Sequence, residues 1–328
     1  MRDDQHFLPR WALGLLAILV PAGLGLIGVY AAVRWFASYG WTLFLAHPVI
    51  VSFLSAFLLR RFDRVGWGTS YGFALLSILA LGAMILLFAM DGLICLIMAL
   101  PLAALLALPG TAFGYALAAK LTARSGSVVS LLILMTFPAF LGFEQAHPFE
   151  PPTRQVTSSL VIDAPIQKVW DEVIAFDRIT SPPTGIFRLG IAYPIQAKIY
   201  GRGVGAIRHC IFSTGPFVEP IVAWEPPHRL EFDVSENPPP MKEFSPYGHI
   251  DAPHLHDTFV SRHGRFLLRE ENGKTVLEGT TWYFQRIAPD WYWHQFSDVI
   301  IHTIHLRVLE QIKRSAEGKA AGLARATP

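Results

Sequence analysis

The sequence predicts a multi-domain protein, in which an N-terminal all-α domain of about five transmembrane helices precedes a C-terminal α+β domain. In the second domain, a curved antiparallel sheet is expected to fold around a long C-terminal helix. Hydrophobic residues make up 52% of the 328 residues and charged residues only 16%, with a mean hydropathy of +0.39. This composition is unusual for a fully soluble protein. Almost all of the apolar excess lies before residue 145, and later segments alternate as strands do.

Five stretches in the first half approach or reach the roughly 20 apolar residues that a helix needs to cross a bilayer. They cover residues 11–33, 41–59, 71–90, 92–118 and 127–143, so residues 1–143 form the expected transmembrane domain. The fourth contains Pro101 and Pro109, and could instead be a broken pair of helices. His47 interrupts the second stretch, and we expect its neutral imidazole to satisfy a carbonyl that Pro48 leaves free.

Positive charge is distributed unevenly between the loops that join these stretches. With the N-terminus inside, only Arg34 lies in an outer loop. The inner segments hold Arg2, Arg10, Arg60, Arg61, Arg64, Lys120 and Arg124. Since Lys and Arg favour the cytoplasmic side, the chain is expected to be an integral protein of the bacterial inner membrane, with its C-terminal domain outside the cytoplasm.

The composition changes at a Pro-rich polar linker, residues 144–154. A domain over 155–317 and a flexible tail over 318–328 are expected after it. An amphipathic helix over about 164–177 follows the first strand, and the last helix runs over about 291–317. Strands are predicted at 155–163, 195–201, 205–214, 217–224, 228–235, 258–270 and 274–287. A sheet in this order can bury one face only by folding around the last helix.

Three segments of this half resemble the START-like, or SRPBCC, superfamily and its polyketide cyclase/dehydrase-like members, which have the helix-grip fold. They are SSLVIDAPIQKVWDEVIAFD, GVGAIRHCIFSTGPFVEPIVAWEPPHRLEFDV, and LEGTTWYF followed by VLEQIKRSAE. The resemblance covers about 155–317 and leaves the membrane half unexplained. It implies a deep, mainly apolar cavity between sheet and helix that binds a lipid, sterol or polyketide-like ligand. Because no catalytic set is common to the family, it implies a pocket rather than a particular reaction.

The predicted last helix carries a polar stripe of His294, Asp298, His302 and His305, which fall within an arc of about 80°. Asp298 could orient an imidazole four residues away, so that His302 or His305 acts as a general base. Three interpretations remain open: the stripe lines the ligand cavity or its mouth, it is a solvated or internally satisfied edge, or it binds a metal.

Residues 236–257 form one long loop, and loops of that length are often functional. It carries His249, His254, His256 and Asp257, which are the candidate metal ligands. We favour polar loop residues at the membrane surface and expect no metal or cofactor. The cysteines, Cys95 and Cys210, form neither a zinc pattern nor a disulfide framework.

Three further residues are expected to contact the ligand in the second domain: Arg208, Trp282 and Tyr283. An inward-pointing Arg208 needs an anionic partner, such as a ligand head group or Glu219.

The sequence therefore predicts a membrane-anchored protein that binds a hydrophobic or amphiphilic ligand beside the bilayer, where tethering raises the local concentration of ligand. One alternative is a membrane-bound cyclase, dehydratase or hydrolase that uses the polar stripe. Another is a ligand-sensing domain that regulates a membrane partner. A net charge of +2 without a basic stripe gives no indication of nucleic-acid binding.

Overall fold

The computed structural model describes residues 9–63, 65–248, 250 and 252–326, and it divides into two compact units. The first unit contains the chain up to Phe149 together with Glu243–His254, and the second contains Glu150–Lys242 and the chain from Leu255 onward. The boundary near residue 150 lies within the predicted linker. The segment Glu243–His254 belongs to the helical unit, although it comes between two strands of the second unit in the sequence.

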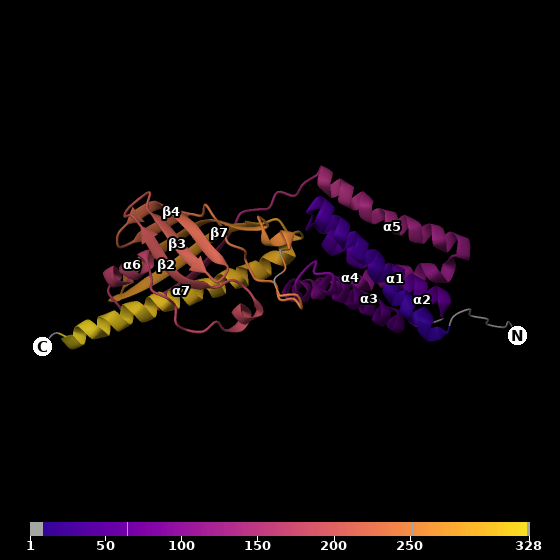
Figure 1. The fold of residues 1–328 in the computed structure, drawn as a ribbon, viewed down its shortest axis with the longest axis horizontal. Helices are drawn as coiled ribbons and strands as arrows, with labels where there is room; N and C mark the ends of the chain where they lie inside the picture. The colour runs from indigo at the N-terminus through magenta and orange to yellow at the C-terminus, as the bar shows by residue number, and fades with distance from the viewer. Residues whose placement is uncertain (1–8, 64, 249, 251, 327–328) are drawn as a thin grey trace. The chain divides into compact units, whose positions relative to one another are not determined.

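The first unit is all-helical. Its helices are α1 (Arg10–Tyr30), α2 (His47–Phe62), α3 (Trp67–Leu87), α4 (Leu93–Lys120) and α5 (Ala123–Ala146) (Figure 1). By length and composition, five segments could cross a membrane, namely Arg10–Trp35, Thr42–Phe62, Trp67–Leu87, Leu93–Lys120 and Ser125–Ala146. The predicted number of helices is confirmed, and α4 continues through both of its prolines instead of breaking into a pair.

Polar side chains inside the bundle bond to backbone carbonyls of neighbouring helices. Pro21 has no N–H to offer the carbonyl of Ala17 four residues earlier, and the hydroxyl of Ser77 donates to that oxygen at 3.2 Å. His47 donates through Nε2 to the carbonyl of Gly25 on α1 at 2.9 Å. The expected role of His47, satisfying a carbonyl of its own helix, is therefore replaced by a bond between helices.

Helices α2 and α4 approach closely because two glycines of α4 face the backbone of α2. A Cβ at Gly110 would lie 2.4 Å from the carbonyl oxygen of Val49, and a Cβ at Gly114 would lie 2.4 Å from that of Phe53. Small residues four apart are typical of tightly packed membrane helices. Any larger side chain there has to push the two helices apart.

Replacing Gly114 by Val is therefore expected to destabilise the protein by about 1–3 kcal/mol, through overpacking against α2. The thermal unfolding midpoint of the full-length chain in detergent measures the effect. Gly82→Val is the matched control, because a Cβ at Gly82 meets no atom within 4 Å, and the same β-branched residue enters a helix in both variants. Equal midpoints for the two variants would contradict the packing described here.

The second unit is a seven-stranded antiparallel sheet with two α-helices. The strands are β1 (Arg154–Ile162), β2 (Pro194–Tyr200), β3 (Ile207–Phe212), β4 (Gly215–Glu225), β5 (Arg229–Asp233), β6 (Phe259–Glu271) and β7 (Lys274–Gln285), and the helices are α6 (Ile166–Ile174) and α7 (Asp290–Ala326). The strand order is β1-β7-β6-β5-β4-β3-β2. Helix α7 packs against β1, β7 and β2, across the curved sheet (Figure 1). This arrangement confirms the predicted helix-grip architecture.

A hydrophobic core lies between the sheet and the two helices of this unit. Leu230 and Leu277 from the strands, Trp170 from α6, and Leu309 and Ile312 from α7 are all buried in it. The start of α7 is fixed by an ion pair between Asp290, in its first turn, and Arg154 at the start of β1. The helix continues to Ala326, past residue 317, where the sequence predicted its end.

Candidate functional site

Three members of the polar stripe of α7, namely Asp298, His302 and His305, bond to the sheet, although His302 is also exposed to solvent. The Nδ1 atoms of His302 and His305 lie 2.7 and 3.1 Å from the hydroxyl oxygen of Ser158 on β1. The other ring nitrogen of His305, Nε2, lies 2.8 Å from the hydroxyl oxygen of Thr281 on β7. A neutral imidazole has one donor and one acceptor nitrogen, and the two hydroxyls can satisfy both nitrogens of His305.

The other two members of the stripe also have partners. Asp298 accepts a 2.5 Å hydrogen bond from the hydroxyl of Tyr283, and His294 donates through Nδ1 to the carbonyl of Asp290 at 2.7 Å. Tyr283 is fully buried. The preceding residue, Trp282, points to the opposite face of the sheet, where its ring lies 5.0 Å from that of His263 at an angle of 59°. A ligand held between the sheet and α7 would therefore touch Tyr283 but not Trp282.

Burial and, to a smaller extent, the neighbouring His302 lower the pKa of His305 to about 4. Because an unfolded histidine titrates near 6.5, the unfolded chain takes up this proton first as the pH falls. The stability due to the neutral imidazole is therefore fully present above about pH 6.5 and is lost towards pH 4, by at most about 3 kcal/mol.

His305→Gln should reduce this loss of stability at acid pH when the unfolding midpoints of the full-length chain are measured between pH 4 and 7. An unchanged slope would rule out His305 as its source.

Arg208, on β3, is 1% exposed and forms an ion pair with Glu219 on β4. Its Nε donates to the carbonyl of Ile174 at 3.2 Å, and its Nη2 has no hydrogen-bond partner among the described residues. Burial raises the pKa of the Glu219 carboxyl, and the charge of Arg208 opposes that rise. The guanidinium stays charged because its own pKa is far above neutrality.

Glu219→Ala should leave a buried, unpaired charge and destabilise the protein by about 3–5 kcal/mol. The double variant Arg208→Met/Glu219→Leu should lose much less, because it removes both charges together. Glu225→Ala, which breaks the solvent-exposed pair with Arg229, is the control and should leave the thermal midpoint of the full-length chain unchanged. If the Glu219 and Glu225 variants behave alike, the Arg208–Glu219 pair does not stabilise the second unit.

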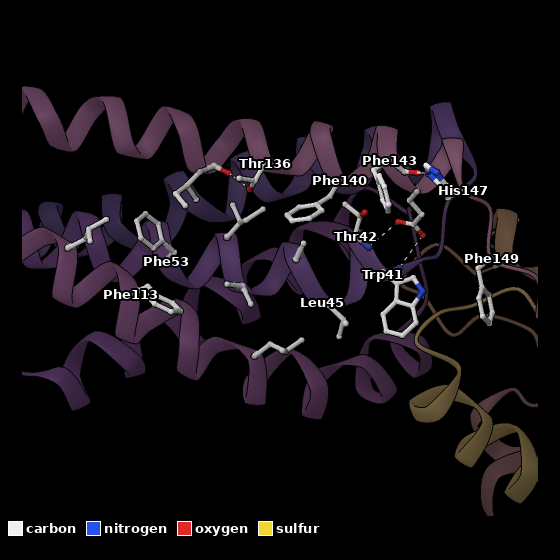
Figure 2. Close-up of a pocket in the computed structure, with 17 residues that line it drawn as sticks. Trp41, Thr42, Leu45, Phe53, Phe113, Thr136, Phe140, Phe143, His147 and Phe149 are labelled. Atoms are coloured by element: carbon white, nitrogen blue, oxygen red, sulfur yellow. Dashed lines mark hydrogen bonds between the residues drawn. The ribbon is translucent and has the colours of Figure 1, made fainter.

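The helical unit contains an apolar cleft of about 850 Å³ between α2, α4 and α5 (Figure 2). Side chains of all three helices line it, as Phe53 of α2, Phe113 of α4 and Phe140 of α5 illustrate. Its full lining is Trp41, Thr42, Leu45, Ala46, Val49, Ile50, Phe53, Leu106, Phe113, Leu117, Ile133, Thr136, Phe140, Phe143, Glu144, His147 and Phe149. The volume falls within the range of small-molecule sites.

One end of this cleft is polar. The carboxylate of Glu144, near the end of α5, accepts hydrogen bonds from the backbone N–H groups of Trp41 and Thr42, each at 3.1 Å. These N–H groups belong to the N-terminal end of the helical segment that leads into α2. A negative charge stabilises this end of a helix. Gly40 makes the approach possible, since a Cβ there would lie 1.2 Å from a carboxylate oxygen of Glu144.

A second polar group of the helical unit gathers Asp91, Cys95, Glu243 and His254, whose potential ligand atoms all lie within 4.8 Å of one another. The Sγ of Cys95 lies 3.1 Å from Oε1 of Glu243 and 3.3 Å from Nε2 of His254. That nitrogen is 3.1 Å from the same Glu243 oxygen and 3.8 Å from Oδ1 of Asp91. Glu243 and His254 are buried, whereas Asp91 and Cys95 are half-buried.

Burial raises the pKa of Asp91 to about 6; the charge of Glu243 adds to the rise, while that of His254 opposes it. Burial works against a charged His254, but its hydrogen bond to Glu243 and the charge of Asp91 raise its pKa above the usual value. Two carboxyls, a thiol and an imidazole thus share one confined space. Such a group needs protons or a cation to balance its negative charge.

Of the predicted metal ligands, only His254 belongs to this group. His256 and Asp257 are in the second unit, where the carbonyl of Asp257 accepts from Arg286 at 2.9 Å. His249 lies outside the described residues.

Three residues of this group, Asp91, Cys95 and Glu243, were not predicted from the sequence. One signal was present: Asp91 and Cys95 lie four residues apart, just before and just inside the fourth predicted span.

No family model and no curated protein matches this chain. Several solved structures are similar to it. A protein from Nitrosospira multiformis is 17% identical, over 51% of this chain and 99% of that one, with a TM-score of 0.31. Truncated norcoclaurine synthase from Thalictrum flavum is 11% identical, over 51% and 96% of the two chains, with a TM-score of 0.32. The di-domain ARO/CYC BexL from the BE-7585A biosynthetic pathway is 16% identical, over 64% and 63%, with a TM-score of 0.32.

Proposed function

We propose that this chain is an integral membrane protein that binds a hydrophobic or amphiphilic ligand, of lipid, sterol or polyketide-like character. The observation that carries the proposal is the apolar cleft between α2, α4 and α5, with its polar end at Glu144 and His147. The proposal moves the binding site from the helix-grip domain, where the sequence favoured it, to the helical unit.

Two energy terms decide which ligands such a cleft retains. A ligand that arrives from water gains about 0.8 kcal/mol for each buried CH₂ group. A ligand that arrives from the bilayer gains almost nothing from burial, because lipid tails are as apolar as the cleft walls. Selection among membrane amphiphiles therefore depends on shape and on the polar end. The carboxylate of Glu144 favours a head group that donates hydrogen bonds.

The side of the membrane follows from charge and chain direction. Arg60, Arg61 and Lys120 lie at the ends of α2 and α4 that are away from Trp41 and Glu144. Under the positive-inside rule these basic ends are cytoplasmic. The polar end of the cleft is then extracytoplasmic, and the helix-grip domain, which follows the end of α5 in the chain, lies on that side too.

The helix-grip unit offers one further contact for an acidic ligand. Nη2 of Arg208 is buried and has no hydrogen-bond partner among the described residues, so it could donate to a carboxylate or phosphate oxygen. Tyr283, Asp298 and the histidines of α7 would serve a ligand there only by exchanging bonds that they now make with the protein.

Leu45→Trp should fill part of the cleft and weaken binding of a fluorescent fatty acid at least about tenfold, which corresponds to about 1.4 kcal/mol. Fluorescence titration of delipidated full-length protein in nanodiscs measures the affinity. Leu79→Trp, at an exposed position of α3 outside the cleft lining, is the matched control and should bind as the wild type does. Wild-type protein that binds neither a fatty-acid nor a sterol probe, or equal affinities for both variants, would overturn the proposal.

A further inference from the structure

The four side chains that meet in the helical unit come from two distant parts of the chain. Asp91 precedes α4 and Cys95 lies in its first turn. Glu243 and His254 are the first and last residues of the segment that belongs to the helical unit but interrupts the second unit in the sequence. This segment is held to the bundle by two other bonds. The backbone N–H of Leu93 donates to the carbonyl oxygen of Phe244 at 3.0 Å, and the hydroxyl of Tyr247 donates to the carbonyl oxygen of Leu87 at 2.6 Å.

The spacing of the four donor atoms fits a tetrahedral metal ion. Zinc bonds of 2.0–2.3 Å to N, O and S ligands place the ligand atoms about 3.3–3.8 Å apart in a tetrahedron. Four of the six pairs of ligand atoms are 3.1–3.8 Å apart, close to these values, and all four atoms lie within 4.8 Å of one another. Thiolate and imidazole favour a borderline ion such as Zn²⁺, whereas Mg²⁺ and Ca²⁺ prefer oxygen ligands alone.

A second, independent observation also points to a cation here. The side chain of Glu243 is 0% exposed, and its Oε2 has no hydrogen-bond donor among the described residues. A buried carboxylate oxygen without a donor is costly, and a metal ion can relieve that cost through one or both oxygens. Gly92 leaves room for this carboxylate, since a Cβ there would lie 1.5 Å from Oε2.

We propose that Asp91, Cys95, Glu243 and His254 bind one Zn²⁺ ion in a closed, structural site that fastens the segment 243–254 to the start of α4. Four protein ligands leave no open position for a reacting water, which distinguishes structural from catalytic zinc sites. The site goes beyond the proposed ligand binding and does not depend on what occupies the cleft.

Cobalt substitution of the full-length protein tests the proposal. Protein purified in detergent, without chelator and without a histidine tag, should contain one zinc per chain by elemental analysis. After treatment with EDTA and addition of Co²⁺, a thiolate-to-cobalt charge-transfer band should appear in the near ultraviolet. Cys95→Ala should abolish this band.

The chain provides its own control, because its only other cysteine is Cys210. Burial raises the pKa of Cys210 to about 12, so it forms no thiolate at neutral pH, and Cys210→Ala should keep the band. His254→Gln should weaken zinc affinity by at least about 10–100-fold, the loss that even an outer-shell change causes.

Wild-type protein decides the question if a variant fails to fold. A wild type that carries no stoichiometric zinc and develops no charge-transfer band with Co²⁺ would overturn the proposal, and the four side chains would then be a proton-sharing network. Persistence of the band in Cys95→Ala would overturn it as well. Zinc in the wild type would support the proposal if Cys95→Ala loses the band and Cys210→Ala keeps it.

Discussion

A buried polar group must find its partner inside the protein, and this requirement organises both units. In an apolar environment an unsatisfied backbone group costs several kcal/mol, so the few polar side chains of the bundle are placed where backbone groups need them. Ser77 bonds to the carbonyl that Pro21 leaves free. Glu144 takes up two N–H groups at the start of the helical segment before α2. The same carboxylate supplies the polar end of the cleft, so satisfying the helix also creates the position that can recognise a head group.

The second unit meets the same requirement differently. Its sheet places Ser158, Thr281 and Tyr283 on the face that α7 covers. Three members of the polar stripe, His302, His305 and Asp298, bond to them. An apolar stripe lies beside it and joins the core. Sheet and helix therefore meet through two matched strips, one polar and one apolar. This matching sets the rotation of α7 about its axis, because turning the helix would bury its histidines against leucines.

Periodicity made the elements predictable from the sequence, since both the apolar helices and the alternating strands repeat at fixed intervals. It also placed His294, Asp298, His302 and His305 on one face of the last helix. It could not say what that face meets, because the partners Ser158 and Thr281 are ordinary strand residues without a distinguishing pattern. The cluster of Asp91, Cys95, Glu243 and His254 was even harder to predict from the sequence. Its hydrogen bonds join residues 148 and 159 positions apart, and the segment that carries Glu243 has no periodicity that assigns it to the helical unit.

Two clusters of ionisable side chains among the described residues have different balances of charge. Arg208 and Glu219 are one cation and one anion, and replacing both by apolar residues would cost little. Asp91, Glu243 and the thiol of Cys95 are three acidic groups beside a single imidazole, so that cluster carries an excess of potential negative charge whenever its acids ionise. A structural ion pair needs no such excess. A cation site does, because the metal ion brings two positive charges and binds ligands only in their deprotonated forms.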